Sequence, residues 1–218
     1  MAQTSTYSLA PLFHAVGEVL RHNQSALNRA DLQNSNHGDH MVEIFQIAAQ
    51  AAQEQSAASP AEALAAASGL LEALSGNGSA KMYAHGLRQM AEQLRRYDVT
   101  LDELVAYVQK VLREEKEAGK SPEPGLARSG DILKALIAGL VSWEQVEGGQ
   151  TPSGNPIDMG VLFEFGMAYW QARQRGGERA AVLADAAASV SPLSKVPHRY
   201  ESGKLAIQAL LQAMQRDA

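Results

Sequence analysis

The sequence predicts an all-α fold, an antiparallel helical barrel or bundle of about eight helices that forms one domain over residues 1–218. Apolar residues recur at steps of three and four along almost the whole chain, which is the spacing of amphipathic helices. Alanine is abundant and β-branched residues rarely follow one another, so close helix packing through small side chains is favoured. No segment alternates apolar and polar residues as a half-buried strand does.

Helices in the first half of the chain are placed by their apolar spacing and by local start and stop signals. The first covers residues 9–28 and the second residues 39–58. Ser59 and Pro60 open a third, with the serine as N-cap and the proline in the first helical position, and residues 75–78 break it. A fourth covers residues 79–97, and Thr100 and Glu103 have the spacing of a capping box that opens a fifth.

The second half of the chain predicts further helices over residues 131–147, 156–174, 178–190 and 204–216. Residues 119–125 and 148–156 are rich in loop-forming residue types and predict loops. Pro192 and Pro197 prevent residues 191–203 from forming one continuous helix, so the last helix is expected to begin at Lys204. The aromatic residues within 163–170 are interpreted as core, with a substrate tunnel as the alternative.

The composition argues against several classes of function. The net charge is −5 and the pI about 5.7, and no cluster of Lys and Arg stands out, so nucleic acid is not an expected partner. The chain has no cysteine, which rules out disulfides and thiolate metal sites and favours a cytoplasmic setting. Residues 1–10 lack the features of a signal peptide, and no stretch approaches the roughly 20 apolar residues of a membrane span, so no membrane insertion is expected.

Residues 27–41, between the first two expected helices, concentrate Asp, Asn and His around a glycine just before a helix N-terminus. Backbone N–H groups at such an end lack intrahelical partners and favour anions. Carboxylates beside them, here Asp31 and Asp39, can hold a hard cation such as Mg²⁺ that bridges phosphate oxygens. The alternative is that Asp39 simply caps the second helix, which is a common role for aspartate.

Two further stretches have features of phosphate sites. In residues 75–83, glycine permits close backbone approach, and the Ser79 hydroxyl with the following N–H groups can bind a phosphate. An ordinary turn containing glycine is the alternative. Residues 195–204 place Lys195, His198 and Arg199 ahead of a glycine and a helix, which suits a phosphate or a base. The alternative there is a solvated loop.

The order of these stretches resembles the nucleotide-binding (L) subunit of dihydroxyacetone kinase, which also forms the second domain of single-chain dihydroxyacetone kinases. The first signature of that family, L-x-x-L-D-x-x-I-G-D-x-D-H-G-x-N-M, is matched by Asp31 and by the pair Asp39 and His40. The second, G-G-x-S-G-P-L-Y-G, is similar to residues 77–84. The later motifs T-L-E-E-L, Gly-Asp before a helix, and D-P-G-A resemble residues 100–104, 130–131 and 201–204, with Lys195 in the place of an arginine. The likeness covers nearly the whole chain.

The resemblance implies an antiparallel barrel of eight helices in which three aspartates hold two Mg²⁺ ions that clamp the phosphates of ATP or of a bound ADP. It also implies a phosphotransferase, a kinase component that acts with a separate K-type subunit carrying the hydroxyketone substrate. Transferred residue by residue, the metal ligands are Asp31, Asn36, His37, Asp39 and His40. The nucleotide-binding residues are Gly78, Ser79, Ala80, Lys81, Asp131, Lys195, Arg199, Glu201 and Gly203.

The chain departs from the family pattern within the expected metal site. The middle aspartate is replaced by His37, or by Asn36 if the alignment starts from Asp31, because the segment is one residue longer. Fewer carboxylates weaken a site for two Mg²⁺ ions, and histidine favours Mn²⁺ or Zn²⁺ instead. Lys81, which replaces a proline, and Lys195 are candidates to offset phosphate charge directly. These departures leave open a non-catalytic relative that binds another ligand or regulates a partner, and the sequence also leaves a homodimer open.

Overall fold

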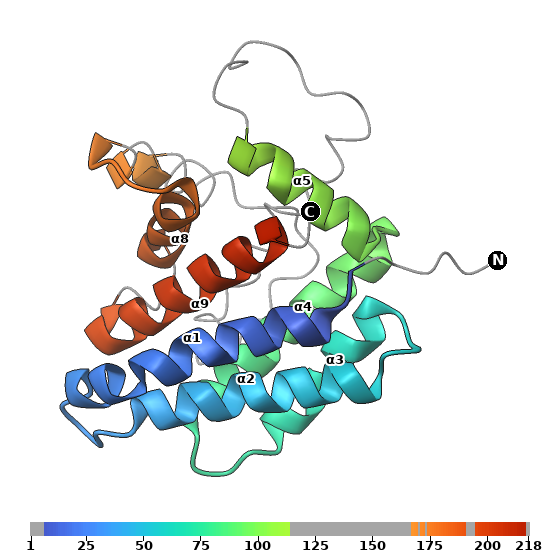
Figure 1. Cartoon of the computed structure of the whole chain (residues 1–218). Coiled ribbons are helices and arrows are strands. Elements are labelled where there is room, and N and C mark those ends of the chain that lie inside the picture. Colours follow the sequence, from blue (N-terminus) through green and yellow to red (C-terminus); the bar gives the residue numbers. More distant parts are fainter. Residues whose placement is uncertain (1–6, 114–166, 170, 173, 191–194, 217–218) are drawn as a thin grey trace.

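A computed structural model of the chain describes residues 7–113, 167–169, 171–172, 174–190 and 195–216. The regular structure in these ranges is helical and contains no strand, which confirms the predicted all-α class (Figure 1). The helices in chain order are α1 (Leu9–Ala30), α2 (His37–Glu54), α3 (Pro60–Glu72), α4 (Gly78–Tyr97), α5 (Leu101–Arg113), α8 (Arg179–Val190) and α9 (Pro197–Arg216).

The helices pack as a bundle around a shared apolar core. α1 and α2 run side by side in opposite directions, α3 packs against α2 and α4, and α9 lies along α1 with α8 against it (Figure 1). The largest fully buried apolar side chains are Leu12, Val16, Leu20, Met41, Ile44, Leu64, Leu71, Leu101 and Val105. Many other core positions are alanines, whose small side chains allow neighbouring helix axes to come close together.

Two predicted helix starts are confirmed by their hydrogen bonds. The Ser59 hydroxyl accepts from the backbone N–H of Glu62, whose carboxylate accepts from the Ser59 backbone, so that a capping box opens α3. Thr100 and Glu103 make the same reciprocal pair at the start of α5. Each box satisfies two N–H groups for which the first turn of a helix has no intrahelical acceptor.

The bounds of α2 differ from the sequence expectation. The helix begins at His37 rather than at residue 39, and it ends at Glu54 rather than at residue 58. His37 therefore lies in the first turn of the helix, together with Asp39 and His40, and the preceding loop is confined to residues 31–36. The signal that decided this boundary is tertiary, because the first N–H groups of α2 find their acceptor on α1.

The start of α9 is a second correction. The helix begins at Pro197 and not at Lys204, and the backbone N–H groups of Arg199 and Tyr200 both donate to the Val196 carbonyl. The expectation was wrong because proline lacks only an N–H that a first helical turn leaves unpaired, so Pro197 opens the helix instead of interrupting it. Glu201 and Gly203 consequently lie inside α9 and not in a loop before it.

Several expectations fall outside the described residues. They include the helix over residues 131–147, most of the helix over residues 156–174, and Asp131 as a nucleotide-binding residue. The helix expected over residues 178–190 is present as α8, which begins one residue later, at Arg179. Among the helices that the structure describes, none is both long and apolar enough to cross a membrane.

Candidate functional site

The three stretches singled out in the sequence meet at one end of the bundle. His37, at the start of α2, contacts Ser202 of α9 through its Nε2 atom, 2.8 Å from the serine Oγ. Arg199 of α9 reaches α4, where its Nη1 lies 3.6 Å from the Met82 sulfur. Asn77, which precedes α4, donates through Nδ2 to the His40 carbonyl in α2. Segments that are far apart in the chain therefore converge where α2, α4 and α9 begin.

Asp31 ends α1 and is buried, and its carboxylate is occupied by the loop that follows it. Its Oδ1 accepts from the backbone N–H groups of Gln33 and Asn34, and its Oδ2 accepts from Asn36. Burial raises the pKa of Asp31, but these three N–H groups, with a smaller contribution from nearby His198, hold that pKa below its ordinary value. The carboxylate therefore shapes the loop from α1 to α2 as an anion.

Asp39 points to α1, where two amide side chains hold its carboxylate. Its Oδ1 accepts from the Gln24 amide at 2.7 Å and from the Asn28 amide at 2.8 Å. Asn28 also accepts, through Oδ1, from the backbone N–H groups of Gly38 at 2.7 Å and Asp39 at 3.2 Å. The hydrogen bonds from Asn28 and Gln24 lower the pKa of Asp39. Asn28 thus caps α2 from the neighbouring helix, a role that its sequence position within α1 did not reveal.

Gly38 is the reason that these two helices come so close together. A Cβ atom at this position would lie 2.3 Å from the Gln24 carbonyl oxygen and 2.8 Å from the Asn28 Oδ1. Both distances are too short for any side chain, and the nearest atom belongs to the rigid backbone of α1. The glycine in the His-Gly-Asp-His sequence therefore serves the contact between α1 and α2, through which Asn28 reaches the start of α2.

His37 is buried between α2 and α9, and its ring packs against His198 with 4.6 Å between the ring centroids. The Ser202 hydroxyl donates to the Arg199 carbonyl at 3.0 Å, so its oxygen is left to accept a hydrogen bond from the His37 Nε2–H. Burial, followed by the charges of His198 and Arg199, lowers the pKa of His37 to about 4, against a smaller opposing effect of Asp31. His37 is therefore a neutral hydrogen-bond donor that joins α2 to α9.

Arg199 has donors that the described residues leave unused. Its Nε is buried without an acceptor, and the Met82 sulfur that its Nη1 contacts is a weak one. The Oδ1 of Asn36 is also buried without a donor. Buried polar atoms in folded proteins nearly always have partners, so these two atoms mark this end of the bundle as a place where a ligand can complete the hydrogen bonding.

The residues of α4 that were expected to bind phosphates are partly exposed and partly buried. Gly78 and Lys81 are exposed in the first turn, whereas Ser79 and Ala80 are buried. Asn77 is the N-cap: its Oδ1 accepts from the Ala80 N–H at 3.0 Å, so that this N–H already has a protein acceptor. Asn77 also donates to the Glu43 carboxylate at 2.9 Å, which ties α4 to α2. The sequence analysis missed Asn77 as a cap, although Asn before Gly-Ser is a usable signal.

The nucleotide-binding residues expected at and before the start of α9 differ in exposure. Lys195 precedes the helix and is exposed, as is Glu201, while Arg199 is half-buried. Gly203 is buried within the second turn of α9, where it packs in the helix rather than approaching a ligand from a loop. The contact of Arg199 with Met82 places its guanidinium between α9 and α4.

The expected metal ligands do not gather in one cluster. Asp31 faces its own loop, Asp39 faces α1, and His37 faces α9. Within the described part of the chain, no group of three or more His, Asp or Glu side chains is arranged to hold a metal ion. These donors therefore do not fit the site for two Mg²⁺ ions that the resemblance implies, because such a cation needs several oxygen ligands directed at one point.

Asp185 of α8 fixes the first half of α9 from the side. The Tyr200 hydroxyl donates to its Oδ1 at 2.5 Å, and Lys204 lies 2.9 Å from the same oxygen. Arg175 approaches the other oxygen at 2.8 Å. Burial, reinforced by the hydrogen bond to Asp185, raises the pKa of Tyr200 to about 12. This network holds the turn of α9 that carries Arg199 and Ser202.

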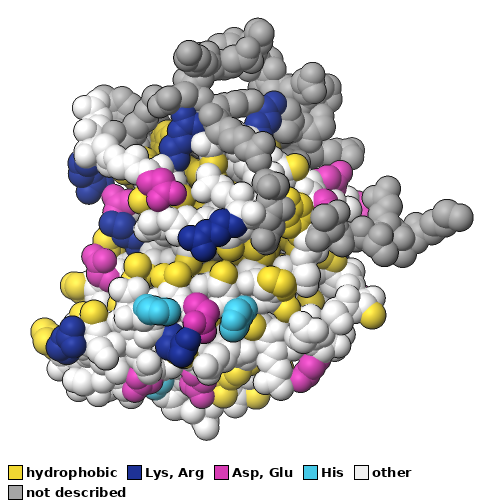
Figure 2. All heavy atoms as spheres, viewed as in Figure 1, with side chains coloured by type: hydrophobic (Ala, Val, Ile, Leu, Met, Phe, Trp, Pro, Cys, Tyr) yellow, Lys and Arg dark blue, Asp and Glu magenta, His cyan; other side chains and the backbone are white. Residues whose placement is uncertain are grey.

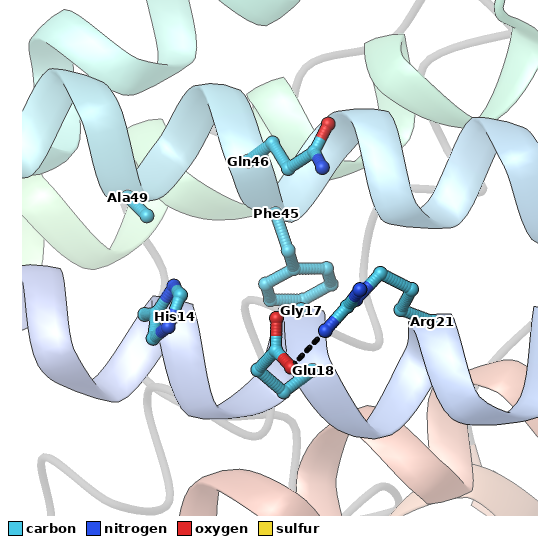
Figure 3. Close-up of a pocket in the computed structure, with 7 residues that line it drawn as sticks. All are labelled: His14, Gly17, Glu18, Arg21, Phe45, Gln46 and Ala49. Atoms are coloured by element: carbon cyan, nitrogen blue, oxygen red, sulfur yellow. Dashed lines mark hydrogen bonds and ion pairs between the residues drawn. The ribbon is translucent and has the colours of Figure 1, made fainter.

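A shallow hollow between α1 and α2 is separate from this end of the bundle (Figure 3). Phe45 lines it from α2, while Glu18 and Arg21 form an ion pair beside it on α1. Arg21 lies nine residues before the end of α1 at Ala30, roughly 13 Å along the helix axis. Acidic, basic and histidine side chains are interspersed over α1 on the face drawn in Figure 2, so no broad patch of one sign marks the hollow as a site.

No family model matches the chain, and neither the curated proteins nor the solved structures contain a match to it.

Proposed function

We propose that this protein is a nucleotide-binding phosphotransferase component, a kinase component that resembles the L subunit of dihydroxyacetone kinase and acts with a separate subunit carrying the substrate. The observation that carries the proposal is the convergence of residues 31–41, 75–83 and 195–204 at one end of the bundle. These are the three stretches whose order carries the resemblance.

The chemistry of phosphoryl transfer agrees with this arrangement. Catalysis of that reaction depends mainly on positioning the phosphates and on stabilising their charge, and it requires little covalent chemistry from the protein. Arg199 supplies guanidinium donors whose buried Nε has no acceptor among the described residues. His198, which precedes Arg199 in the first turn of α9, packs against the His37 ring, and the first turns of α2 and α9 add backbone dipoles that favour negative charge.

Thermal melting with nucleotides tests the proposal. ATP or ADP at a hundred times its dissociation constant should stabilise the folded chain by about 2.7 kcal/mol. For a chain of this size that corresponds to a rise in Tm of about 5–10 °C. Adenosine, which lacks phosphates, is the matched control and should give little change. If neither ATP nor ADP raises Tm with or without Mg²⁺, Mn²⁺ or Zn²⁺, the proposal is wrong.

A second candidate is a non-catalytic relative that binds a ligand or regulates a partner. The engagement of Asp31 and Asp39 by protein groups, together with His37 in the place of an aspartate, favours it. An activity assay separates the two candidates. A kinase component that is mixed with a K-type subunit and ATP should transfer phosphate to dihydroxyacetone. Nucleotide binding without any transfer in that mixture would favour the regulatory relative.

A further inference from the structure

The charges around His37 describe the electrostatic character of the candidate site. Arg199, which carries a full positive charge, lies in the turn of α9 that His37 contacts through Ser202, and His198 packs against the His37 ring with 4.6 Å between the ring centroids. The Asp31 charge is itself compensated by three backbone N–H groups. A guanidinium close to a compensated carboxylate disfavours a divalent cation and favours an anion.

The hydrogen-bonding groups lead to the same conclusion by an independent route. The carboxylates that would hold a metal have protein donors, and they face different elements. The guanidinium of Arg199, by contrast, keeps a buried Nε without an acceptor among the described residues and contacts the Met82 sulfur of α4. An arginine with unused donors suits phosphate oxygens, because its planar fork makes charge-assisted hydrogen bonds to them.

We propose that this chain binds the phosphates of its nucleotide without a divalent metal, through the donors that Arg199 and His198 present at the start of α9. The inference rests on the proposed nucleotide-binding function and differs from the Mg²⁺-dependent binding that the resemblance implies. His37 and Ser202 are positioning residues in this arrangement, because their hydrogen bond fixes the turn of α9 from which Arg199 and His198 extend. Asp31 and Asp39 shape and cap the neighbouring segments instead of holding a cation.

Calorimetric titration with ATP, ADP and inorganic triphosphate tests this inference in two buffers of equal ionic strength, one with EDTA and one with Mg²⁺. ATP should bind in EDTA at least as tightly as in Mg²⁺, because Mg²⁺ in solution complexes the same phosphate oxygens that Arg199 would bind. Arg199→Gln should weaken binding in EDTA by about tenfold or more, which is the size expected for one charge-assisted contact. Triphosphate should compete with ATP, since the recognition is of phosphate groups.

Three further variants separate the possible outcomes. His198→Gln tests the second donor group and keeps the inference testable if Arg199→Gln should fail to fold. Asp39→Asn retains an oxygen that accepts from Gln24 and Asn28, so it should leave ATP binding in the Mg²⁺ buffer unchanged if no metal is held there. Arg95→Gln removes the same charge from an exposed position in the last turn of α4 and is the matched control. The melting transition of each variant establishes that it is folded.

The results distinguish this inference from the function on which it depends. ATP binding that appears only with Mg²⁺, or that Asp39→Asn abolishes, would overturn metal independence and leave the nucleotide-binding function standing. Binding in EDTA that neither Arg199→Gln nor His198→Gln weakens would overturn the assignment of these residues. The absence of ATP and ADP binding in both buffers would overturn the proposed function and the inference together.

Discussion

The Nε2 atom of His37 lies 2.8 Å from the Oγ atom of Ser202, although the two residues are 165 positions apart in the chain. Both side chains are buried, and the pair joins the first turn of α2 to the second turn of α9. The Ser202 hydroxyl donates its hydrogen bond to the Arg199 carbonyl. Its oxygen can therefore only accept from His37, which requires a proton on the histidine Nε2. A neutral imidazole meets that requirement without placing a charge in the interface.

The first prediction concerns pH. The pKa of His37 is lowered from 6.5 to about 4, so between these values the unfolded chain binds more protons than the folded one. The contribution of neutral His37 to stability is therefore complete above pH 6.5 and is lost as the pH falls towards 4. At about 1.4 kcal/mol per pKa unit the full change is about 3 kcal/mol. Urea unfolding at a series of pH values measures it.

Two substitutions control this pH dependence. His37→Gln retains an N–H donor for Ser202 but cannot take up a proton, so its stability should vary less between pH 6.5 and 4. His14→Gln removes an exposed histidine of α1 and should leave the wild-type slope intact. The lowered pKa values of Asp31 and Asp39 reduce stability only as the pH falls below about 5, and the comparison with His37→Gln removes this shared contribution. An unchanged slope in His37→Gln would contradict the assignment to this residue.

The second prediction is that Gly38→Ala destabilises the chain by about 2–3 kcal/mol, the upper part of the range for overpacked sites. The new Cβ would collide with the backbone carbonyl of Gln24, which cannot move without shifting α1. Gly69→Ala in α3 is the matched control, because nothing lies within 4 Å of its added Cβ. That change should be neutral or stabilise by up to about 1 kcal/mol, since alanine is the better helix former. Equal effects of the two substitutions in urea unfolding would refute the close approach.

The third prediction is that Asn28→Ala lowers the free energy of unfolding by about 1–2 kcal/mol, as does the loss of a helix cap. The variant removes the acceptor for the Gly38 and Asp39 N–H groups and one donor to the Asp39 carboxylate. Asn23→Ala is the control, because the Asn23 amide donates only within α1, to Val19. Its effect should stay within about 0.5 kcal/mol. Similar losses for the two asparagines would argue against a cap across helices.

The fourth prediction concerns the network around Asp185. Tyr200→Phe removes a hydrogen bond to a charged acceptor and should cost about 1.5 kcal/mol, the lower end of the range because Lys204 and Arg175 remain on the carboxylate. The same substitution in an Asp185→Asn background should cost less, since the acceptor is then uncharged. Chemical unfolding of the single and double variants gives the coupling free energy. Strict additivity would mean that the hydroxyl and the carboxylate do not interact.

The sequence was informative about the helices because the signals that place them are local. Apolar spacing marked the first five helices, and the capping boxes at Ser59 and Thr100 needed only residues three positions apart. The start of α9 was predicted wrongly at Lys204 because Pro197 was interpreted only as a helix breaker. A proline is ambiguous in sequence, since it both ends a preceding helix and opens a following one.

The candidate site was predicted as three stretches, and the structure brings the three together. The directions of the side chains within them were not readable from the sequence. Asp39 was expected to face a metal and instead faces Gln24 and Asn28, while His37 points to α9. Successive residues of a helix are separated by about 100° around its axis, so the neighbours of α2 decide what each of them contacts.

By itself, the sequence determined the helical class, the positions of most described helices and the segments in which polar residues gather, because each depends on residues close together in the chain. Only the tertiary structure decided that Asn28 caps a neighbouring helix, that Gly38 is needed for the contact with Gln24, and that His37 joins Ser202. These contacts depend on how α1, α2 and α9 are packed against one another. That packing follows from burial of the whole core, which no local pattern of residues specifies.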